Sequence, residues 1–265
     1  MPSDLFDLTD KVAIVSGAAQ GMGRAIALAI AGAGAHLILV DRNEAGARRT
    51  ADGITATRAI VSGTDVSQPA EIRELFHTLD REFGRIDFLA NVAGESIMAA
   101  PEDISLEDVE QVWRNLVLGR FCACQEAGRR MLKAGGGSIL NIGSIASVTA
   151  LGRGHIAYGM AMGAVVQMTR ELSTEWAAAG VRVNAVLPAQ VLNPGLEQRI
   201  AENPALRDKF LSGIPAGRFG HPDDIRGLAV LLASDASKWI TGAIIPMDGG
   251  NLAMNAGGSP RRPAQ

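Results

Sequence analysis

The chain has 265 residues, of which 47% are apolar and 20% charged, and its net charge is −3. This length suits one α/β domain with a large core and is short for two independent domains. The composition argues against a disordered chain, and the charge offers no basic surface for nucleic acid. No apolar run reaches the roughly 20 residues that span a bilayer, and no secretory leader opens the chain, so we expect a cytoplasmic protein with no membrane partner.

Short β-branched runs alternate with helical patterns along the chain. Strands are expected at residues 11–16, 35–40, 58–62, 86–90, 138–142, 181–187 and 243–247, and helices at 24–33, 43–54, 69–83, 105–133, 158–179 and 222–234. This alternation requires parallel strands joined by right-handed crossovers. It predicts an α/β fold, a doubly wound parallel sheet of about seven strands with helices on both faces.

No linker or internal repeat divides the chain, so we expect a single domain over residues 1–250. Residues 190–215 are polar and partly helical, and they are expected to cover a pocket as a lid. Residues 251–265 resemble a flexible tail. Cys122 and Cys124 are spaced two apart in a helical pattern and point to different faces, so they predict neither a disulfide nor a metal site.

Three glycines, Gly17, Gly21 and Gly23, stand between the first strand and the helix that follows. Glycine at this point permits a tight turn and lets backbone N–H groups approach a pyrophosphate at the helix N-terminus. The second strand ends at Asp41, whose carboxylate would accept hydrogen bonds from ribose hydroxyls and repel a 2′-phosphate. Arg42 could instead stack on adenine or hold a phosphate. On balance the pattern favours NAD over NADP.

Further segments match those of a known family. They are Asp65-Val66, Asn91-x-Ala93-Gly94, Asn115 within WRNLVLG, Ser144, Tyr158, RVNAVLP, and GRFGHPDDIRGLAVLLASDASKWITGAIIPMDGG near the end. With the glycine loop, they make the chain resemble the short-chain dehydrogenase/reductase (SDR) family to about Gly250. The resemblance implies a Rossmann-type fold, a nicotinamide cofactor and a homotetramer or homodimer. It also implies an oxidoreductase that interconverts a secondary alcohol and a ketone by hydride transfer.

The resemblance further implies a role for individual residues. Ser144 would hold the substrate oxygen, Tyr158 would be the general acid/base, and Asn115 would support a water chain behind it. The implied cofactor-binding set is Gly17, Gln20, Gly21, Met22, Gly23, Asp41, Arg42, Asp65, Val66, Asn91, Ala93, Gly94, Tyr158, Pro188, Val191 and Asn193. No group of residues indicates a metal site. Glu95, Ser96, His155 and Gln190 are candidate contacts to a small alcohol or ketone.

Met162 departs from the family pattern. The family has a lysine four residues after the tyrosine, on the same face of the helix, where it favours the phenolate and holds the nicotinamide ribose. Such help matters because an unperturbed tyrosine has a pKa of about 10. Methionine carries no charge and donates no hydrogen bond. Arg170 and Lys133 are too distant in the pattern, so the sequence identifies no replacement cation.

Three interpretations of Met162 stay open at this point. The natural enzyme works without the lysine, aided by the positive charge of the oxidised nicotinamide. Alternatively, the protein binds NAD without redox turnover, as a sensor, a scaffold or a non-redox enzyme. The third interpretation is an introduced Lys→Met change that arrests catalysis. We favour the first interpretation, which predicts an NAD-dependent oxidoreductase whose activity is impaired by Met162.

Overall fold

The computed structural model describes residues 2–254. Of the tail predicted for residues 251–265, residues 255–265 therefore lie outside the described residues. Residues 251–254 form a turn that is bonded to the body of the domain: the Leu252 N–H donates to Asp248 Oδ2 at 2.7 Å, and the Asn251 side chain donates to Gly213 O. The ordered domain thus extends slightly beyond its predicted end at residue 250.

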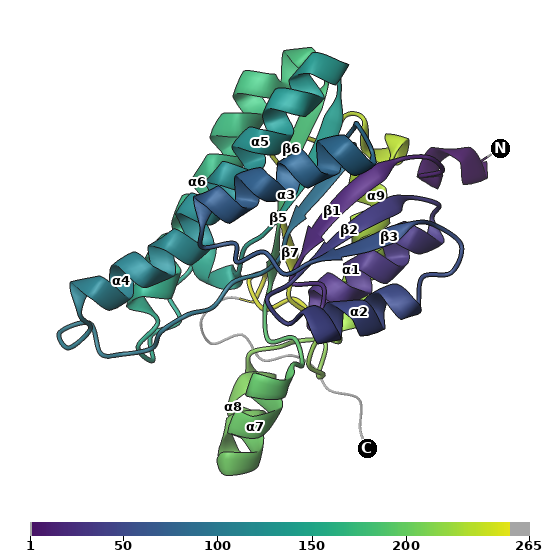
Figure 1. Ribbon diagram of the computed structural model, residues 1–265. Coiled ribbons are helices and arrows are strands. Elements are labelled where there is room, and N and C mark those ends of the chain that lie inside the picture. The colour runs from purple at the N-terminus through teal and green to yellow at the C-terminus, as the bar shows by residue number, and fades with distance from the viewer. Residues whose placement is uncertain (1, 255–265) are drawn as a thin grey trace.

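Seven parallel strands form one sheet in the order β3-β2-β1-β4-β5-β6-β7, which confirms the predicted fold class (Figure 1). The strands are β1 (Val12–Ser16), β2 (His36–Val40), β3 (Ala59–Ser62), β4 (Phe88–Asn91), β5 (Gly137–Ile142), β6 (Val181–Pro188) and β7 (Ile244–Met247). The order reverses between β1 and β4, and ligands of such sheets bind beyond the carboxyl ends of the strands at this point.

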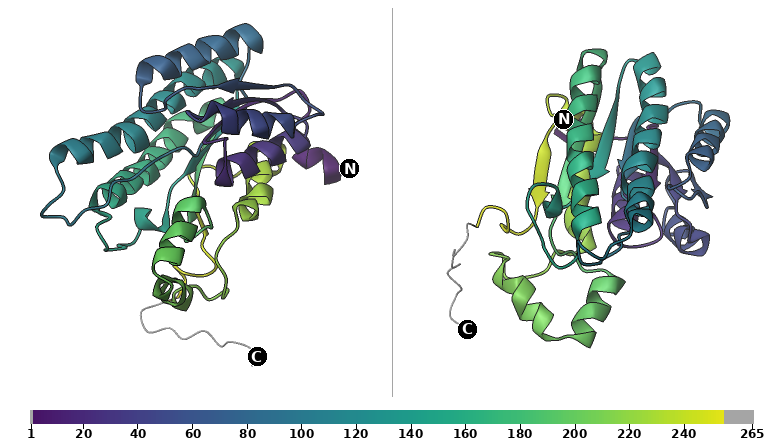
Figure 2. Two further views of the ribbon diagram at one scale, coloured as in Figure 1. Left: turned by 60° about the horizontal axis from the view of Figure 1, so that its bottom comes forward. Right: turned by 90° about the vertical axis from the view of Figure 1, so that its left-hand side faces the viewer.

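Helices cover both faces of the sheet (Figures 1 and 2). They are α1 (Gly21–Gly32), α2 (Glu44–Asp52), α3 (Pro69–Glu82), α4 (Leu106–Trp113), α5 (Gly119–Ala134), α6 (Ile156–Trp176), α7 (Pro194–Glu202), α8 (Ala205–Ser212) and α9 (Arg226–Ala233). One face carries α3, α4, α5 and α6, and the other carries α1, α2 and α9. The short helix predicted over 222–234 begins with a 3₁₀ turn (Pro222–Ile225) before α9.

Two apolar cores form because successive residues of a strand point to opposite faces of the sheet. In β1, Ala13 and Val15 pack against the core under α1 and α9. Val12 and Ile14 pack against the core under α3 and α5. All four residues are almost fully buried, as expected of a parallel sheet that is covered on both faces. The strands therefore form a rigid base for the loops at their carboxyl ends.

The helix predicted over residues 105–133 is interrupted. A π-helical segment (Arg114–Leu118) separates α4 from α5, and the Gly119 N–H donates to Arg114 O five residues earlier. A π turn holds one residue more than an α turn, so it changes the face on which the following residues lie. Gly119 has no side chain because a Cβ there would overlap the carbonyl oxygen of Val66. The start of α5 is therefore set tightly against the loop after β3.

Helices α7 and α8 project beyond the carboxyl ends of the strands, and they correspond to the predicted lid (Figures 1 and 2). Their apolar residues Leu196 and Phe210 pack with Ile214 and Phe219 in a small cluster of their own. The apolar residues of the segment thus hold the lid together. Among the described residues, no helix is both long and apolar enough to cross a membrane.

Candidate active site

The glycine loop after β1 is shaped for close approach of a ligand to the backbone. Gly17 and Gly21 have φ values of +70° and +56°, which are strained for residues with a side chain. A Cβ on Gly23 would overlap Gly17 O, whereas a Cβ on Gly21 would meet open space. The loop therefore packs tightly on itself and leaves one side open at the N-terminus of α1. This shape suits a pyrophosphate, as the sequence predicted.

The open side of the loop borders a cavity of about 290 Å³, here named the glycine-loop cavity. Thirteen of the residues predicted around the cofactor or its water chain line it: Gly17, Gln20, Gly21, Met22, Gly23, Asp41, Arg42, Asp65, Val66, Ala93, Gly94, Asn115 and Asn193. They come from the ends of β1, β2, β3 and β4, from the start of α1, from the π segment and, for Asn193, from the N-cap of α7. The donors and carboxylates present fit a dinucleotide.

Asp41 is tied to the glycine loop by its own carboxylate. Its Oδ2 accepts from the Ala19 N–H at 3.0 Å, and its Oδ1 accepts from the Asn43 N–H at 2.9 Å. Each carboxylate oxygen can accept a further hydrogen bond, so hydroxyl groups of a ligand can still bind. The position of the negative charge at the edge of the cavity is thereby fixed.

Arg42 and Glu95 form an ion pair across the same cavity, and Asp65 Oδ2 lies 3.9 Å from Arg42 Nη1. The hydrogen bond that Arg42 donates to Glu95 is the main reason why the pKa of Arg42 is raised. Glu95 was predicted to be a substrate contact. The structure places it beside Arg42 instead, because the loop after β4 turns toward β2 at this point.

Asn91 and Asn193 also differ from their expected surroundings. Asn91 is 3% exposed and does not line the cavity, since its amide donates to Asn141 Oδ1 at 2.9 Å and to the Cys124 sulfur at 3.3 Å. It holds β4 to β5 below the cavity. Asn193 lines the cavity, but its Oδ1 caps α7 by accepting from the Leu196 N–H, and its Nδ2 donates to Val191 O.

A second cavity, of about 190 Å³, brings the two predicted hydroxyl groups together and is here named the Ser144–Tyr158 cavity. Of the predicted residues, it is lined by Ser96, Ser144, His155, Tyr158, Pro188 and Gln190, and it is completed by Ile145, Leu151, Arg153, Ala189, Leu196, Arg199 and Phe210. Ser96, His155 and Gln190, which were predicted to contact a substrate, therefore line the same cavity as the two hydroxyl groups. Leu196, Arg199 and Phe210 belong to the lid.

Ser144 keeps its hydroxyl proton available. Its Oγ accepts from the Ala146 N–H at 3.1 Å, which caps a short 3₁₀ helix (Ile145–Ser147). A serine hydroxyl has one proton to donate besides its two lone pairs. Because the cap uses only a lone pair, the hydroxyl proton is free to be donated to another group.

Tyr158 stands in the first turn of α6 and is half-buried. His155 precedes the helix, and its ring centroid lies 6.0 Å from that of Tyr158. Burial, followed by the charges of Arg153 and Arg199, lowers the pKa of His155. The imidazole is therefore neutral at neutral pH, and its buried Nδ1 has no hydrogen-bond partner. Gln190 Oε1 is unpartnered in the same way.

Met162 lines neither cavity. It is 1% exposed and lies in an apolar cluster with Val112, Leu116 and Val165, against which Tyr158 packs. The π segment supplies Leu116 to this cluster and Asn115 to the glycine-loop cavity, where Asn115 Oδ1 is buried without a partner. No charge is present where the family resemblance places a lysine.

Arg120 is the residue near the site that the sequence interpretation missed. It is 4% exposed, and its guanidinium donates to Ile142 O and, at 3.1 Å, to Ala93 O. Burial lowers its pKa to about 10, while the charge of Tyr158 acts in the opposite direction. A signal was present in the sequence, because Arg120 is a cation within the otherwise apolar helical stripe of Leu116, Ala123 and Ala127.

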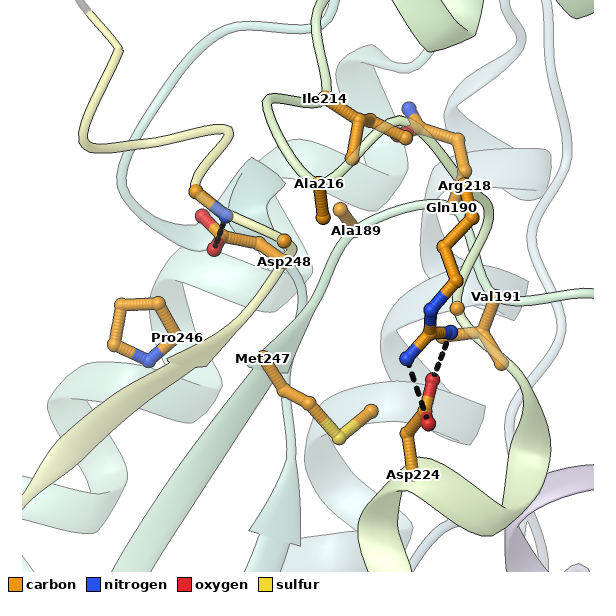
Figure 3. A pocket seen from close by; sticks show the side chains of 13 residues that line it. Ala189, Gln190, Val191, Ile214, Ala216, Arg218, Asp224, Pro246, Met247 and Asp248 are labelled. Atoms are coloured by element: carbon orange, nitrogen blue, oxygen red, sulfur yellow. Dashed lines mark hydrogen bonds and ion pairs between the residues drawn. The ribbon is translucent and has the colours of Figure 1, made fainter. Parts of the chain in front are cut away.

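Val191 lies in a third cavity, of about 420 Å³, rather than in either of the other two. Figure 3 shows it below Gln190, beside the bidentate ion pair of Arg218 and Asp224, whose N–O distances are 2.7 and 3.0 Å. The Leu192 N–H donates to Gly220 O at 2.9 Å, so the segment after β6 pairs with the loop that precedes α9. This pairing fixes the base of the lid.

The sequence matches a known family over nearly all of its length. The family described as enoyl-(acyl carrier protein) reductase matches residues 17–251. The chain is 41% identical over 247 residues to the D-threitol dehydrogenase of Mycolicibacterium smegmatis, with 92% of this chain and 94% of that protein covered. It is 36% identical over 245 residues to the NAD-dependent glycerol dehydrogenase of Listeria innocua. This match covers 92% of this chain and 95% of that protein.

A solved structure agrees with these matches. The short-chain type dehydrogenase/reductase from Mycobacterium marinum superposes with a TM-score of 0.85 at 32% sequence identity, and the match covers 94% of this chain and 97% of that one. The chain is therefore similar to these proteins in both sequence and fold.

Proposed function

Because this chain belongs to the short-chain dehydrogenase/reductase family, we propose that it is an NAD-dependent oxidoreductase that interconverts a secondary alcohol and a ketone. The observation that carries the proposal is that Ser144 and Tyr158 share one cavity. This cavity adjoins the glycine-loop cavity through the consecutive residues Glu95 and Ser96. A reacting carbon bound near the two hydroxyl groups would therefore lie beside the nucleotide.

Each residue has a separate task in this reaction. A bound nicotinamide would supply the hydride chemistry, so that the carbinol carbon could lose a hydride on oxidation and the ketone carbon could regain it on reduction. Tyr158 accepts the proton of the alcohol during oxidation and donates it back during reduction. Ser144 donates its free hydroxyl proton to the same substrate oxygen and so fixes the orientation of the carbon. The backbone of the glycine loop and Asp41 hold the dinucleotide.

The charges around Asp41 support NAD over NADP. The fixed carboxylate can accept ribose hydroxyl groups and repels a 2′-phosphate. Arg42 was the residue that could have favoured NADP. Its guanidinium is already paired with Glu95 and lies close to Asp65, so it is not free to neutralise a phosphate.

The Ser144–Tyr158 cavity favours a small substrate that carries several oxygen atoms. Arg153 and Arg199 line it, and neither forms an ion pair within the described part of the chain. Two buried atoms without partners among the described residues add to this polarity: Gln190 Oε1 is an acceptor, and His155 Nδ1 is a donor or an acceptor according to its tautomer. We therefore propose a polyol or a sugar acid as the substrate class, which agrees with the names of the two polyol dehydrogenases among the relatives.

We also propose that the protein is a homotetramer or homodimer. Helices α5 and α6 leave apolar side chains exposed on the outer face of the domain, among them Phe121, Leu132 and Met160, and Leu118 precedes them in the π segment. Exposed apolar residues gathered in this way are typical of subunit contacts. Light scattering of the purified protein tests this directly, and a monomer at all concentrations would contradict it.

Steady-state NADH formation tests the proposed function. We expect turnover on at least one member of a panel of polyols, sugar acids and simple secondary alcohols, and loss of about 10²- to 10⁴-fold in kcat in Tyr158→Phe. Nucleotide affinity measured by calorimetry should fall far less than kcat in this variant, because Tyr158 is only one of the residues predicted to contact the cofactor. Tight NAD binding with no turnover above the Tyr158→Phe control would favour a non-redox NAD-binding protein instead.

A further inference from the structure

Arg120 is a buried cation without a carboxylate partner. It is 4% exposed, and within residues 2–254 no Asp or Glu forms an ion pair with it. Removing a charged group from water costs several kcal/mol unless other groups compensate. Its charge persists nevertheless, because even the lowered pKa of about 10 leaves the guanidinium protonated at neutral pH.

The backbone compensates this burial only in part. Arg120 Nη1 and Nη2 donate to Ile142 O and Ala93 O, at the carboxyl ends of β5 and β4. Its Nε–H is buried without any acceptor. Carbonyl oxygens supply dipoles but no negative charge, so the position still favours an anion nearby.

Arg120 and Tyr158 are connected through shared neighbours. A Cβ built on Gly94 would meet both Leu116 and Arg120 Nη2, and Tyr158 packs on the apolar cluster to which Leu116 belongs. Tyr158 and Cys124 are also the two titratable groups whose charges would raise the pKa of Arg120. Burial raises the pKa of Cys124 to about 12, so this thiol stays neutral. Cys124 also lies in the hydrogen-bonded group of Asn91 and Asn141. Tyr158 is therefore the group that can provide the missing negative charge, and it is also the proposed proton acceptor.

We propose that Arg120 supplies the positive charge that stabilises the phenolate of Tyr158, and that it replaces from α5 the lysine that the family carries on α6. This inference rests on the proposed function, because stabilising the phenolate serves the reaction only if Tyr158 is the proton acceptor. Arg120 is a positioning residue, since it acts on the reaction through Tyr158. The π segment makes this possible, because it sets the face on which the first residues of α5 lie.

The surroundings of Met162 agree with the replacement of the family lysine on α6 by Arg120 on α5. The side chain at position 162 lies in the apolar cluster of Val112, Leu116 and Val165, where the stem of a lysine would also have to pack. Arg120 also reaches the wall of the glycine-loop cavity: a Cβ built on Gly94 would lie 3.1 Å from Arg120 Nη2. The guanidinium thus lies behind the cofactor site.

Other charged groups around Tyr158 do not duplicate this role. His155 faces it from the N-terminal side of α6, and its lowered pKa keeps it neutral at neutral pH. Arg153 and Arg199 line the same cavity from the loop before α6 and from the lid, and Arg153 stacks on Phe210 at 4.9 Å. Both face the substrate side of the cavity, whereas Arg120 approaches from α5.

Tyr158 is the only tyrosine of the chain, so phenolate absorbance in the near ultraviolet reports on it alone. The test is a spectrophotometric pH titration of the full-length protein without nucleotide, with Tyr158→Phe as the blank. Arg120→Gln keeps hydrogen-bond donors and removes the charge, while Arg120→Lys keeps the charge. Arg129→Gln, at an exposed position on the same helix, is the matched control.

We expect the midpoint of phenolate formation to rise by about one pH unit or more in Arg120→Gln and to change much less in Arg120→Lys and Arg129→Gln. An unchanged midpoint in Arg120→Gln would overturn the proposal, as would equal increases in the Gln and Lys variants. Because neither substrate nor nucleotide is needed, this result is independent of whether turnover is found.

A measurement on the unaltered protein covers the case in which the variants fail to fold. The side-chain ¹⁵N resonances of Arg120 should shift with pH at the same midpoint as the phenolate absorbance of Tyr158. Arg120 resonances that stay constant while Tyr158 ionises would contradict the proposal.

Discussion

The glycine-loop cavity and the Ser144–Tyr158 cavity are built by different means. The first depends mainly on backbone geometry, with glycines that allow positive φ and close contact at Gly17, Gly21 and Gly23. The second depends on side chains that come from loops and helices far apart in the sequence. A backbone site tolerates few substitutions at its glycines, whereas a charge in a side-chain site can be supplied from another helix. We infer that Arg120 illustrates this second case.

The largest effect on the backbone site is expected from Gly23→Ala. The added Cβ would overlap Gly17 O, so the loop must move. Overpacking of this kind costs about 1–3 kcal/mol, and we therefore expect NAD affinity to fall about tenfold or more by calorimetry. Gly32→Ala, at the other end of α1 with open space around it, is the matched control and should bind NAD normally. Equal affinities of the two variants would argue against a close-packed loop.

A smaller effect is expected from Asp41→Asn, which removes the charge and keeps one of the two acceptor oxygens that the loop uses. The preference for NAD over NADP should decrease about tenfold, equivalent to about 1.4 kcal/mol. Competitive binding of the two nucleotides measures this ratio, and Asp52→Asn at the end of α2 controls for net charge. A ratio that does not change would mean that the carboxylate does not discriminate against the 2′-phosphate.

The smallest effect concerns pH and the side-chain site. Burial, then Arg153 and Arg199, lowers the pKa of His155, while an unfolded histidine titrates near about 6.5. The unfolded chain thus binds more protons below that pH. The contribution of neutral His155 to stability is full above about pH 6.5 and is lost as the pH falls toward its folded pKa.

We therefore expect the Tm of the protein to decrease more between about pH 7.5 and about pH 5.5 than that of His155→Gln. His77→Gln, at an exposed position on α3, serves as the control and should follow the unaltered protein. The same decrease in all three proteins would show that His155 does not contribute to the acid sensitivity.

The sequence was sufficient for the parts of the molecule that local patterns determine. The strands, their parallel order and the glycine loop follow from short runs and turn residues. Glu95 and Val191 lie elsewhere than expected because the direction of a loop depends on its tertiary partners, here Arg42 and Gly220. The break between α4 and α5 depends on the hydrogen bond from the Gly119 N–H to Arg114 O, five residues earlier. No residue type in the sequence predicts such a bond.

Arg120 is the most informative omission. Its helical stripe showed a cation among apolar residues, but only the structure brings that stripe against Ala93 and Ile142. Asn91 was predicted to line the cofactor site. An amide at a strand end can face the ligand or the core, and here hydrogen bonds to Asn141 and Cys124 hold it in the core. Contacts with residues distant in the sequence therefore decide whether such a side chain faces the ligand or the core.

The most direct test of the proposed role of Arg120 moves the positive charge from position 120 on α5 to position 162 on α6. It compares kcat for the unaltered protein, Arg120→Met, Met162→Lys and the double variant on one substrate at one pH. We predict that Met162→Lys alone does not raise kcat, that Arg120→Met lowers it, and that the double variant recovers at least about tenfold, or about 1.4 kcal/mol, over Arg120→Met. An increase of orders of magnitude in Met162→Lys, together with no loss in Arg120→Met, would contradict the account.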